Sequence, residues 1–190
     1  MPWWGKLLIG IGVVALVIII VAWLVGKYNK LVEGKEKVKN GWSQIDVQLR
    51  RRFDLIPNLV ETVKGYATHE KETLENVTMW RGRVGSASTT EEAIEANKGL
   101  SSALSRLLVS VERYPELKAN QNFLRLQTEL TEIENKIAFA RQFYNDTVQK
   151  YNLLVKRFPS NIVASMFKFG EEKFFEVDND IRENVPQVKF

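Results

Sequence analysis

Hydrophobic and polar positions divide this chain into one unbroken apolar run and a longer stretch with regular spacing of three and four. The run from Leu7 to Val25 carries no charge and holds 14 leucine, isoleucine and valine residues. As a helix it would reach about 28 Å, close to the hydrocarbon thickness of a bilayer. A cleaved signal peptide would have a shorter apolar core, and a buried core helix would have a polar face. The pattern therefore predicts a single membrane-spanning helix.

The flanks of this run agree with a membrane span. Aromatic residues lie where the two interfacial belts of a bilayer should be, namely Trp3, Trp4, Trp23 and Tyr28. One lysine, Lys6, precedes the run, whereas five follow it between Lys27 and Lys39. Because basic residues concentrate on the cytoplasmic side, we expect the N-terminus outside and the remaining chain in the cytoplasm. A periplasmic placement of the C-terminal part stays open.

Beyond the run, apolar residues recur every three or four positions from Leu31 to Ala67, which predicts one face of an amphipathic helix. Pro57 lacks the N–H that would bond to the carbonyl of Phe53, so we expect a kink or a new helix there. The pattern leaves open whether the chain reverses near His69 or only at Gly82. Residues 82–90 are rich in glycine, serine and threonine and predict a loop.

Two further helices follow this loop. Thr89 and Glu92 predict a capping box that opens a helix ending at Tyr114. A long helix from Glu116 to Arg157 is expected next, because apolar positions repeat without a break along it. Its predicted seam consists of Phe123, Leu126, Leu130, Ile133, Ile137, Ala140, Tyr144, Thr147, Tyr151, Leu154 and Phe158. Such a repeat favours coiled-coil-like packing.

These elements predict an all-α fold, in which a single N-terminal transmembrane helix is followed by an elongated antiparallel bundle of three to four long helices. The expected organisation is a tail at 1–6, the span at 7–25, the helical bundle at 27–175 and a loosely ordered tail at 176–190. After Pro159, an apolar segment contains Ile162, Val163, Met166, Phe167 and Phe169. This candidate contact segment either covers one end of the bundle or lies on the membrane surface or a partner.

The composition offers little for catalysis. Cysteine is absent and His69 is the only histidine, so neither a thiol nucleophile nor a two-histidine metal site can be built. The stretch from His69 to Thr73 falls short of the HExxH zinc pattern. A net charge of +4 without a dense basic stripe argues against nucleic acid as a partner. We therefore expect no catalytic, cofactor or metal site, and no small-molecule substrate is evident.

One polar cluster is noteworthy. Asp46, Arg50, Asp54 and Asn58 are four residues apart and share one helical face. Pairs at this spacing stabilise a helix by about 0.2–0.5 kcal/mol each. The same residues could instead satisfy polar atoms on another helix or form a face for a partner. Arg52, Arg141, Glu132 and Glu134 are interpreted in a similar way, as solvated or inter-helix pairs.

Several strings resemble the LemA family of bacterial membrane-anchored helical proteins. They are residues 28–32 (YNKLV), 42–46 (WSQID), 48–60 (QLRRRFDLIPNLV), 62–67 (TVKGYA), 69–70 (HE), 114–119 (YPELKA), 138–141 (AFAR), 144–145 (YN) and 158–164 (FPSNIVA). The resemblance covers essentially the whole chain. It implies one span and an elongated helical bundle at the bacterial inner membrane, and it implies no particular reaction.

The functional expectation is a membrane-anchored, non-enzymatic scaffold or interaction protein. It would assemble with itself or bind other membrane proteins, and Ala22 and Gly26 form a weak small-residue packing motif for this in the span. An alternative is an accessory or adaptor role in envelope quality control, for example beside a membrane protease. An enzyme is the third and least favoured hypothesis.

Overall fold

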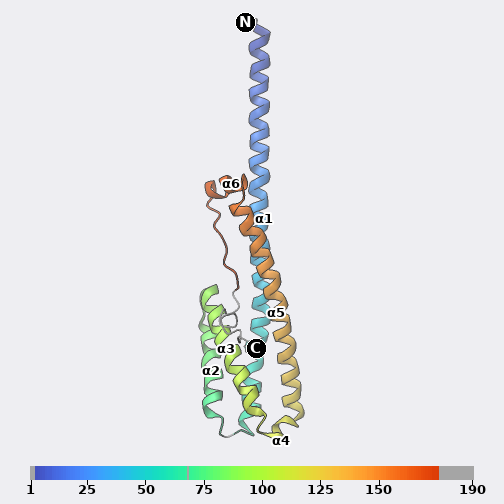
Figure 1. The fold of residues 1–190 in the computed structure, drawn as a ribbon, viewed down its shortest axis with the longest axis vertical. Helices are drawn as coiled ribbons and strands as arrows, with labels where there is room; N and C mark the ends of the chain where they lie inside the picture. Colours follow the sequence, from blue (N-terminus) through green and yellow to red (C-terminus); the bar gives the residue numbers. More distant parts are fainter. Residues whose placement is uncertain (1–2, 68, 176–190) are drawn as a thin grey trace, which may run out of the picture. The chain divides into compact units, whose positions relative to one another are not determined.

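The computed structural model describes residues 3–67 and 69–175, and every regular element in these ranges is a helix (Figure 1). The helices are α1 (Trp3–Lys64), α2 (Lys71–Ser86), α3 (Thr90–Val111), α4 (Pro115–Lys118), α5 (Gln121–Lys156) and α6 (Ser160–Met166). The all-α prediction is thereby confirmed. The tail at 176–190, expected to be loosely ordered, and the side chain of Trp3 lie outside the described part.

The chain forms two compact units. The anchor unit comprises residues 1–41 and 143–190, and the bundle unit comprises residues 42–142. Helices α1 and α5 each contribute to both units. The domain boundaries expected from the sequence, at 6/7, 25/27 and 175/176, stay predictions.

The N-terminal half of α1 is the apolar run. No described side chain between Gly10 and Gly26 is buried, although most of them are large and aliphatic. In the described part of the chain, α1 is the one helix long and apolar enough to cross a membrane. Exposed aliphatic side chains on every side of a helix are stable in lipid and costly in water. This feature suggests membrane anchoring.

The bundle unit contains the C-terminal part of α1 together with α2, α3, α4 and the first part of α5. The chain reverses between Lys64 and Lys71, which answers the question that the pattern left open. The helices α2 and α3 pack closely, because a Cβ atom added at Gly99 would collide with the indole of Trp80. The predicted capping box is confirmed: Thr89 Oγ1 accepts from the Glu92 N–H at 3.2 Å, and Glu92 Oε2 accepts from the Thr89 N–H at 3.3 Å.

Two predicted boundaries were wrong, and one of the two alternatives at Pro57 is excluded. No new helix begins at Pro57, because α1 continues through it to Lys64 and the neighbouring Ile56 and Leu59 are buried; the alternative of a kink there stays a prediction. The expected loop at 82–90 is only three residues long, because α2 extends to Ser86. The expected helix from Glu116 to Arg157 is divided into α4 and α5, because Asn120 Oδ1 accepts from the Phe123 N–H and caps a new helix.

The predicted apolar positions of α5 are buried or half-buried from Phe123 to Leu154. The prediction fails only for Phe158, which is 75% exposed because α5 ends at Lys156. In the anchor unit, α5 approaches α1 closely at Gly34, where an added Cβ atom would lie 3.1 Å from Tyr151 Cδ2. The chain then turns into α6 and returns as an extended segment, residues 169–175, drawn in red-brown in Figure 1.

Candidate functional site

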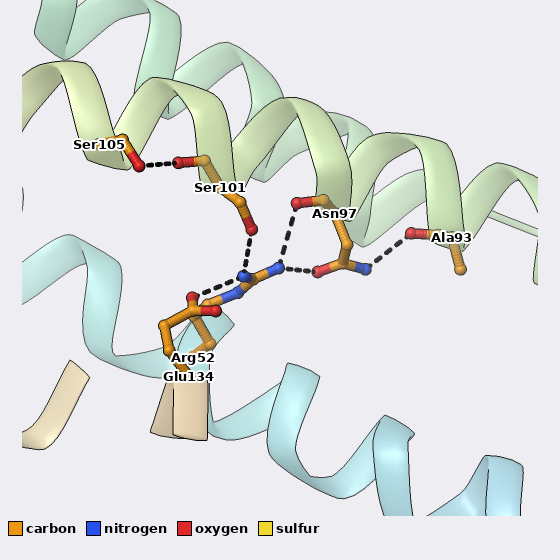
Figure 2. A network of polar contacts seen from close by, with 6 residues as sticks. All are labelled: Arg52, Ala93, Asn97, Ser101, Ser105 and Glu134. Atoms are coloured by element: carbon orange, nitrogen blue, oxygen red, sulfur yellow. Dashed lines mark hydrogen bonds and ion pairs between the residues drawn. The ribbon is translucent and has the colours of Figure 1, made fainter. Parts of the chain in front are cut away.

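A buried arginine joins three helices of the bundle unit (Figure 2). The side chain of Arg52, on α1, is completely buried. Its Nη1 donates to Ser101 Oγ and to Glu134 Oε1, both at 2.7 Å. Its Nη2 donates to Asn97 Oδ1 at 2.5 Å and to the Asn97 carbonyl at 3.2 Å. One guanidinium therefore joins α1 to α3 and to α5.

The surroundings of Arg52 indicate a structural role for this network. Asn97 is itself oriented by its Nδ2, which donates to the Ala93 carbonyl at 2.7 Å. Burial and the charge of Arg52 lower the pKa of Arg141, while Glu134 opposes this shift. Glu134 is partly exposed, so its carboxylate compensates the buried charge without itself being isolated from water. A guanidinium cannot lose its proton and here has fixed acceptors, so the arrangement fixes helix register rather than moving protons.

A second buried charge lies at the turn between α1 and α2. Glu70 is buried, and its Oε1 accepts from Arg113 Nη2 at 2.6 Å and from the Tyr114 hydroxyl at 3.1 Å. Burial together with this hydrogen bond raises the pKa of Tyr114. Both buried charges thus make short hydrogen bonds within the bundle unit, and of their buried nitrogen and oxygen atoms only Nε of Arg52 has no hydrogen-bond partner among the described residues.

The predicted cluster of Asp46, Arg50, Asp54 and Asn58 lies on the exposed face of α1. Arg50 Nε and Asp54 Oδ1 are 3.7 Å apart in a solvated pair. The structure does not bring all four residues into one depression. Only Asp54 and Asn58 line a groove between α1 and α5, with a volume of about 470 Å³. Its lining carries three basic and three acidic side chains and comprises Arg51, Asp54, Leu55, Asn58, Arg125, Leu126, Glu129, Glu132, Ile133 and Lys136.

A larger groove, with a volume of about 770 Å³, lies between α2 and the C-terminal end of α1. We call it the α1/α2 groove; it is lined by Val60, Glu61, Lys64, Ala67, Lys71, Leu74, Glu75 and Thr78. Its floor is apolar, and each rim carries an ion pair along one helix. The pairs Lys64–Glu61 and Lys71–Glu75 both measure 3.8 Å. An apolar floor between charged rims is the usual geometry for receiving an amphipathic helix.

The candidate apolar segment of the anchor unit contains both buried and exposed side chains. Val163 is buried, whereas Ile162, Met166 and Phe167 are at least half exposed. The Tyr28 ring centroid lies 4.8 Å from that of Phe167 and 5.7 Å from that of Phe169. Two predicted sets, the aromatic belt and the apolar segment, therefore meet at Tyr28.

The return segment is held to α5 by side chains that bond to its backbone. Asn152 Nδ2 donates to the Glu172 carbonyl at 2.8 Å, and Asn152 Oδ1 accepts from the Glu172 N–H at 2.9 Å. Asn145 makes the same pair of bonds with Phe175, at 3.0 and 2.8 Å. We call these two asparagines the tail clamp. The Tyr144 hydroxyl adds a bond to the Lys173 carbonyl at 2.9 Å.

With this geometry in place, comparison with known proteins gives a consistent assignment. The sequence model of the LemA family matches residues 41–190, which is most of the chain. The chain belongs to the LemA family. The matched range includes the Arg52 network, both grooves, the tail clamp and α6, whereas the apolar half of α1 precedes it.

Individual relatives of this LemA-family chain are distant. Protein LemA of Metamycoplasma hominis is 25% identical over 85% of this chain and 74% of the relative. Magnetosome protein MamQ 2 of Paramagnetospirillum magneticum is 26% identical over 84% of this chain and 68% of the relative. Magnetosome protein MamQ of Magnetospirillum gryphiswaldense is 25% identical over 90% and 72%, respectively. None of these names states a reaction.

The most connected polar residues of this LemA-family chain were not singled out as a site from its sequence. Arg52 and Glu134 were interpreted as solvated or inter-helix pairs, and the inter-helix alternative is the one observed. A signal was available, since Arg52 lies three residues after Leu49 and four before Ile56, within the apolar stripe. Asn97 occupies a similar position before Leu100. A polar residue at a core position predicts a buried partner, although the pattern does not identify that partner.

Metal chemistry finds no support in the described part of this LemA-family chain. Within residues 3–67 and 69–175, no three histidine, cysteine or carboxylate side chains lie together in a way that could hold a metal ion. His69 is exposed at the turn before α2.

Proposed function

We propose that this LemA-family chain is a membrane-tethered interaction protein that holds a partner at a bilayer and catalyses no reaction of its own. In this proposal α1 spans the membrane, and the bundle unit provides the binding surface. The observation that carries the proposal is the α1/α2 groove, with its apolar floor of Val60, Ala67 and Leu74 between charge-paired rims. The occupant that fits this groove is an amphipathic helix, either of another membrane protein or of a second copy.

The charges of the bundle unit support binding rather than catalysis. Arg52 and Glu70 are buried, but Arg52 donates hydrogen bonds to α3 and α5, and Glu70 accepts one from Arg113 in the turn after α3. The groove residues that could carry charge lie at the rims, where they are solvated. Catalytic sites usually combine a concave surface with perturbed titratable groups directed into it. The α1/α2 groove provides the concave surface and the apolar contact area, and its rim charges would orient a partner helix.

Site-specific photo-cross-linking in native membranes tests this proposal. A photoreactive residue at Thr78, on the groove, should give defined adducts, whereas one at the exposed Arg106 on α3 should not. The variant Val60→Glu places a charge on the floor and should abolish these adducts, while Val109→Glu, on an exposed surface of α3, should leave them unchanged. Adducts that persist unchanged in Val60→Glu would contradict the proposal.

The mass of the adducts then distinguishes self-assembly from binding to another protein. Adducts of twice the chain mass indicate self-assembly through the groove. Adducts with a different protein indicate a hetero-complex, and a membrane protease among them would favour the accessory role in envelope quality control. The orientation of the span is measured in the same membranes by protease protection of residues 27–175, for which the lysine distribution predicts a cytoplasmic location.

A further inference from the structure

The apolar face of α6 lies beside the point where α1 leaves the predicted span. Tyr28 is three residues beyond Val25, which corresponds to about 4.5 Å along the helix. Phe167 and Phe169 contact the ring of Tyr28, so the end of α6 lies at the same height along α1. The headgroup region on each side of a bilayer is roughly 5–8 Å thick. The structure therefore places α6 in the headgroup layer if α1 spans the membrane as proposed.

The outer surface of α6 is apolar and open. Val163 and Ala164 are buried against the anchor unit, whereas Phe158, Ile162, Met166 and Phe167 remain at least half exposed. We call these four exposed side chains the α6 face. A cluster of large apolar side chains marks a binding surface, and here it adjoins Tyr28, three residues after the exposed aliphatic side chains of α1.

Three cations lie beside this face. Lys27, Lys30 and Arg157 line a cavity of about 300 Å³ whose walls include Leu31, Leu154 and Phe158. Lys27 and Lys30 are two and five residues beyond Val25, or about 3 and 7.5 Å along α1, which is the depth of lipid phosphates. Within the described part of the chain, none of the three forms an ion pair.

The nearest acidic group in sequence is Glu33, whose pKa is lowered mainly by Lys37 and to a smaller extent by the charge of Lys30. Glu33 Oε1 accepts from Lys37 Nζ at 2.6 Å. The cavity therefore combines space, three positive charges and apolar walls. This combination suits the phosphate of a lipid whose acyl chains lie along the α6 face.

The backbone at the end of α6 supports the same interpretation. Lys168 has φ of 57°, a left-handed conformation that glycine adopts without strain. The Phe169 N–H donates to the Ala164 carbonyl at 2.9 Å and the Lys168 N–H to the Ser165 carbonyl at 3.3 Å, which is the glycine-type ending of a helix. A cation thus occupies the position where glycine would be least strained, and its exposed side chain is next to the α6 face.

We propose that the α6 face and the cavity of Lys27, Lys30 and Arg157 form a binding site for an anionic phospholipid in the same bilayer that α1 spans. The α6 face enters the boundary between headgroups and acyl chains, and the three cations bind the headgroup phosphate. This inference depends on the tether in the proposed function but not on the α1/α2 groove.

Depth measurements on the full-length chain test the placement of the α6 face. Because the chain has no cysteine, single cysteines can be introduced and labelled with a nitroxide without altering a native thiol. Probes at Ile162 and Met166 in nanodiscs should collide more with oxygen than with a nickel chelate. The matched probes are Ile18, in the span, and Asp146, on an exposed turn of α5 in the same unit.

These probes distinguish a failure of the lipid-binding inference from a failure of the membrane tether. If Ile18 is lipid-exposed and Met166 resembles Asp146, the lipid-binding inference is wrong while the tether stands. If Ile18 itself reports water, both are wrong. If Ile162 and Met166 resemble Ile18, the placement of the α6 face is supported.

A second measurement tests the cations. Native mass spectrometry of the full-length chain in detergent should show bound phosphatidylglycerol in preference to phosphatidylcholine. Removing two of the cations with Lys30→Gln and Arg157→Gln should weaken this binding by about tenfold or more. The control pair Lys136→Gln and Lys150→Gln removes the same charge elsewhere and should leave binding unchanged. Equal losses in both pairs, or displacement of the lipid by millimolar inorganic phosphate, would overturn the assignment to a lipid.

Discussion

The Arg52 network provides the sharpest test of how the bundle unit is held together. The variant Arg52→Met keeps most of the aliphatic stem and removes the guanidinium. Ser101 can rotate its hydroxyl toward another partner, and Glu134 is exposed enough to be hydrated. Asn97 is almost completely buried, so its Oδ1 would lose its donor without access to water. The effect of the change therefore falls mainly on Asn97.

The magnitude follows from these contacts. A hydrogen bond to a charged group contributes about 1.5–3 kcal/mol, and a buried acceptor left without a donor costs about 1–3 kcal/mol. Methionine recovers part of this loss through packing, so we expect a decrease of about 3 kcal/mol in the free energy of unfolding. For a chain of 190 residues this corresponds to a fall of about 6–12 °C in Tm.

Thermal unfolding of the full-length chain in detergent, followed by circular dichroism at 222 nm, measures this change. The control is Arg50→Met, which removes an exposed arginine from its 3.7 Å pair with Asp54 and should lower the free energy of unfolding by less than about 1 kcal/mol. In the double variant Arg52→Met, Asn97→Leu, the orphaned acceptor is removed as well, so part of the stability should return. Equal Tm values for Arg52→Met and Arg50→Met, or strict additivity in the double variant, would refute the reasoning.

Three further changes can be measured in the same assay. Gly99→Ala should destabilise the chain by about 1–3 kcal/mol, because its Cβ would collide with the indole of Trp80. The control Gly82→Ala has open space around it and should stabilise the chain by up to about 1 kcal/mol. Equal effects of the two changes would show that α2 and α3 are not packed as described. Tyr151→Phe should leave Tm unchanged or raise it, because the buried Tyr151 hydroxyl has no hydrogen-bond partner among the described residues; a clear decrease would reveal a partner. Hydrogen bonds from the two residues before α3 lower the pKa of Glu92 below its ordinary 4.5, so its contribution is present above that pH and is lost as the pH falls through the lowered value. Glu92→Ala should therefore melt below the wild type at pH 7, and the difference should shrink as the pH falls below 4.5. A difference that stays constant on acidification would exclude the carboxylate as the cause.

The helices could be predicted from the sequence because burial follows directly from the spacing of apolar residues. The stripe from Leu31 to Ala67 and the seam from Phe123 to Leu154 are buried or half-buried as expected. Their ends could not be predicted as well, because tertiary contacts decide them. Gly85 remains helical where its backbone passes close to the Phe53 ring, and Asn120 ends one helix and caps the next.

The candidate surfaces were predicted only in part. Periodicity identifies which face of a helix is buried but not which helix covers it, so the α1/α2 groove and the partners of Arg52 required the structure. The exposed pair of Arg50 and Asp54 was predictable because both residues lie on one helix, four positions apart. The meeting of Tyr28 with Phe167 involves residues far apart in sequence, and no local pattern relates them.

The tail clamp is a contact that the spacing of apolar residues does not predict, and it helps to position α6. An extended segment without a neighbouring strand must satisfy its backbone groups in another way. Asn145 and Asn152 are seven residues apart on α5, or about 10.5 Å along the helix axis, while Glu172 and Phe175 are three extended residues apart, or about 10 Å. Because the two distances match, both asparagines bond to the segment at once, and a slip of one residue would break both pairs. The segment after α6 is therefore fixed in register against α5, and this contact helps to hold α6 beside Tyr28.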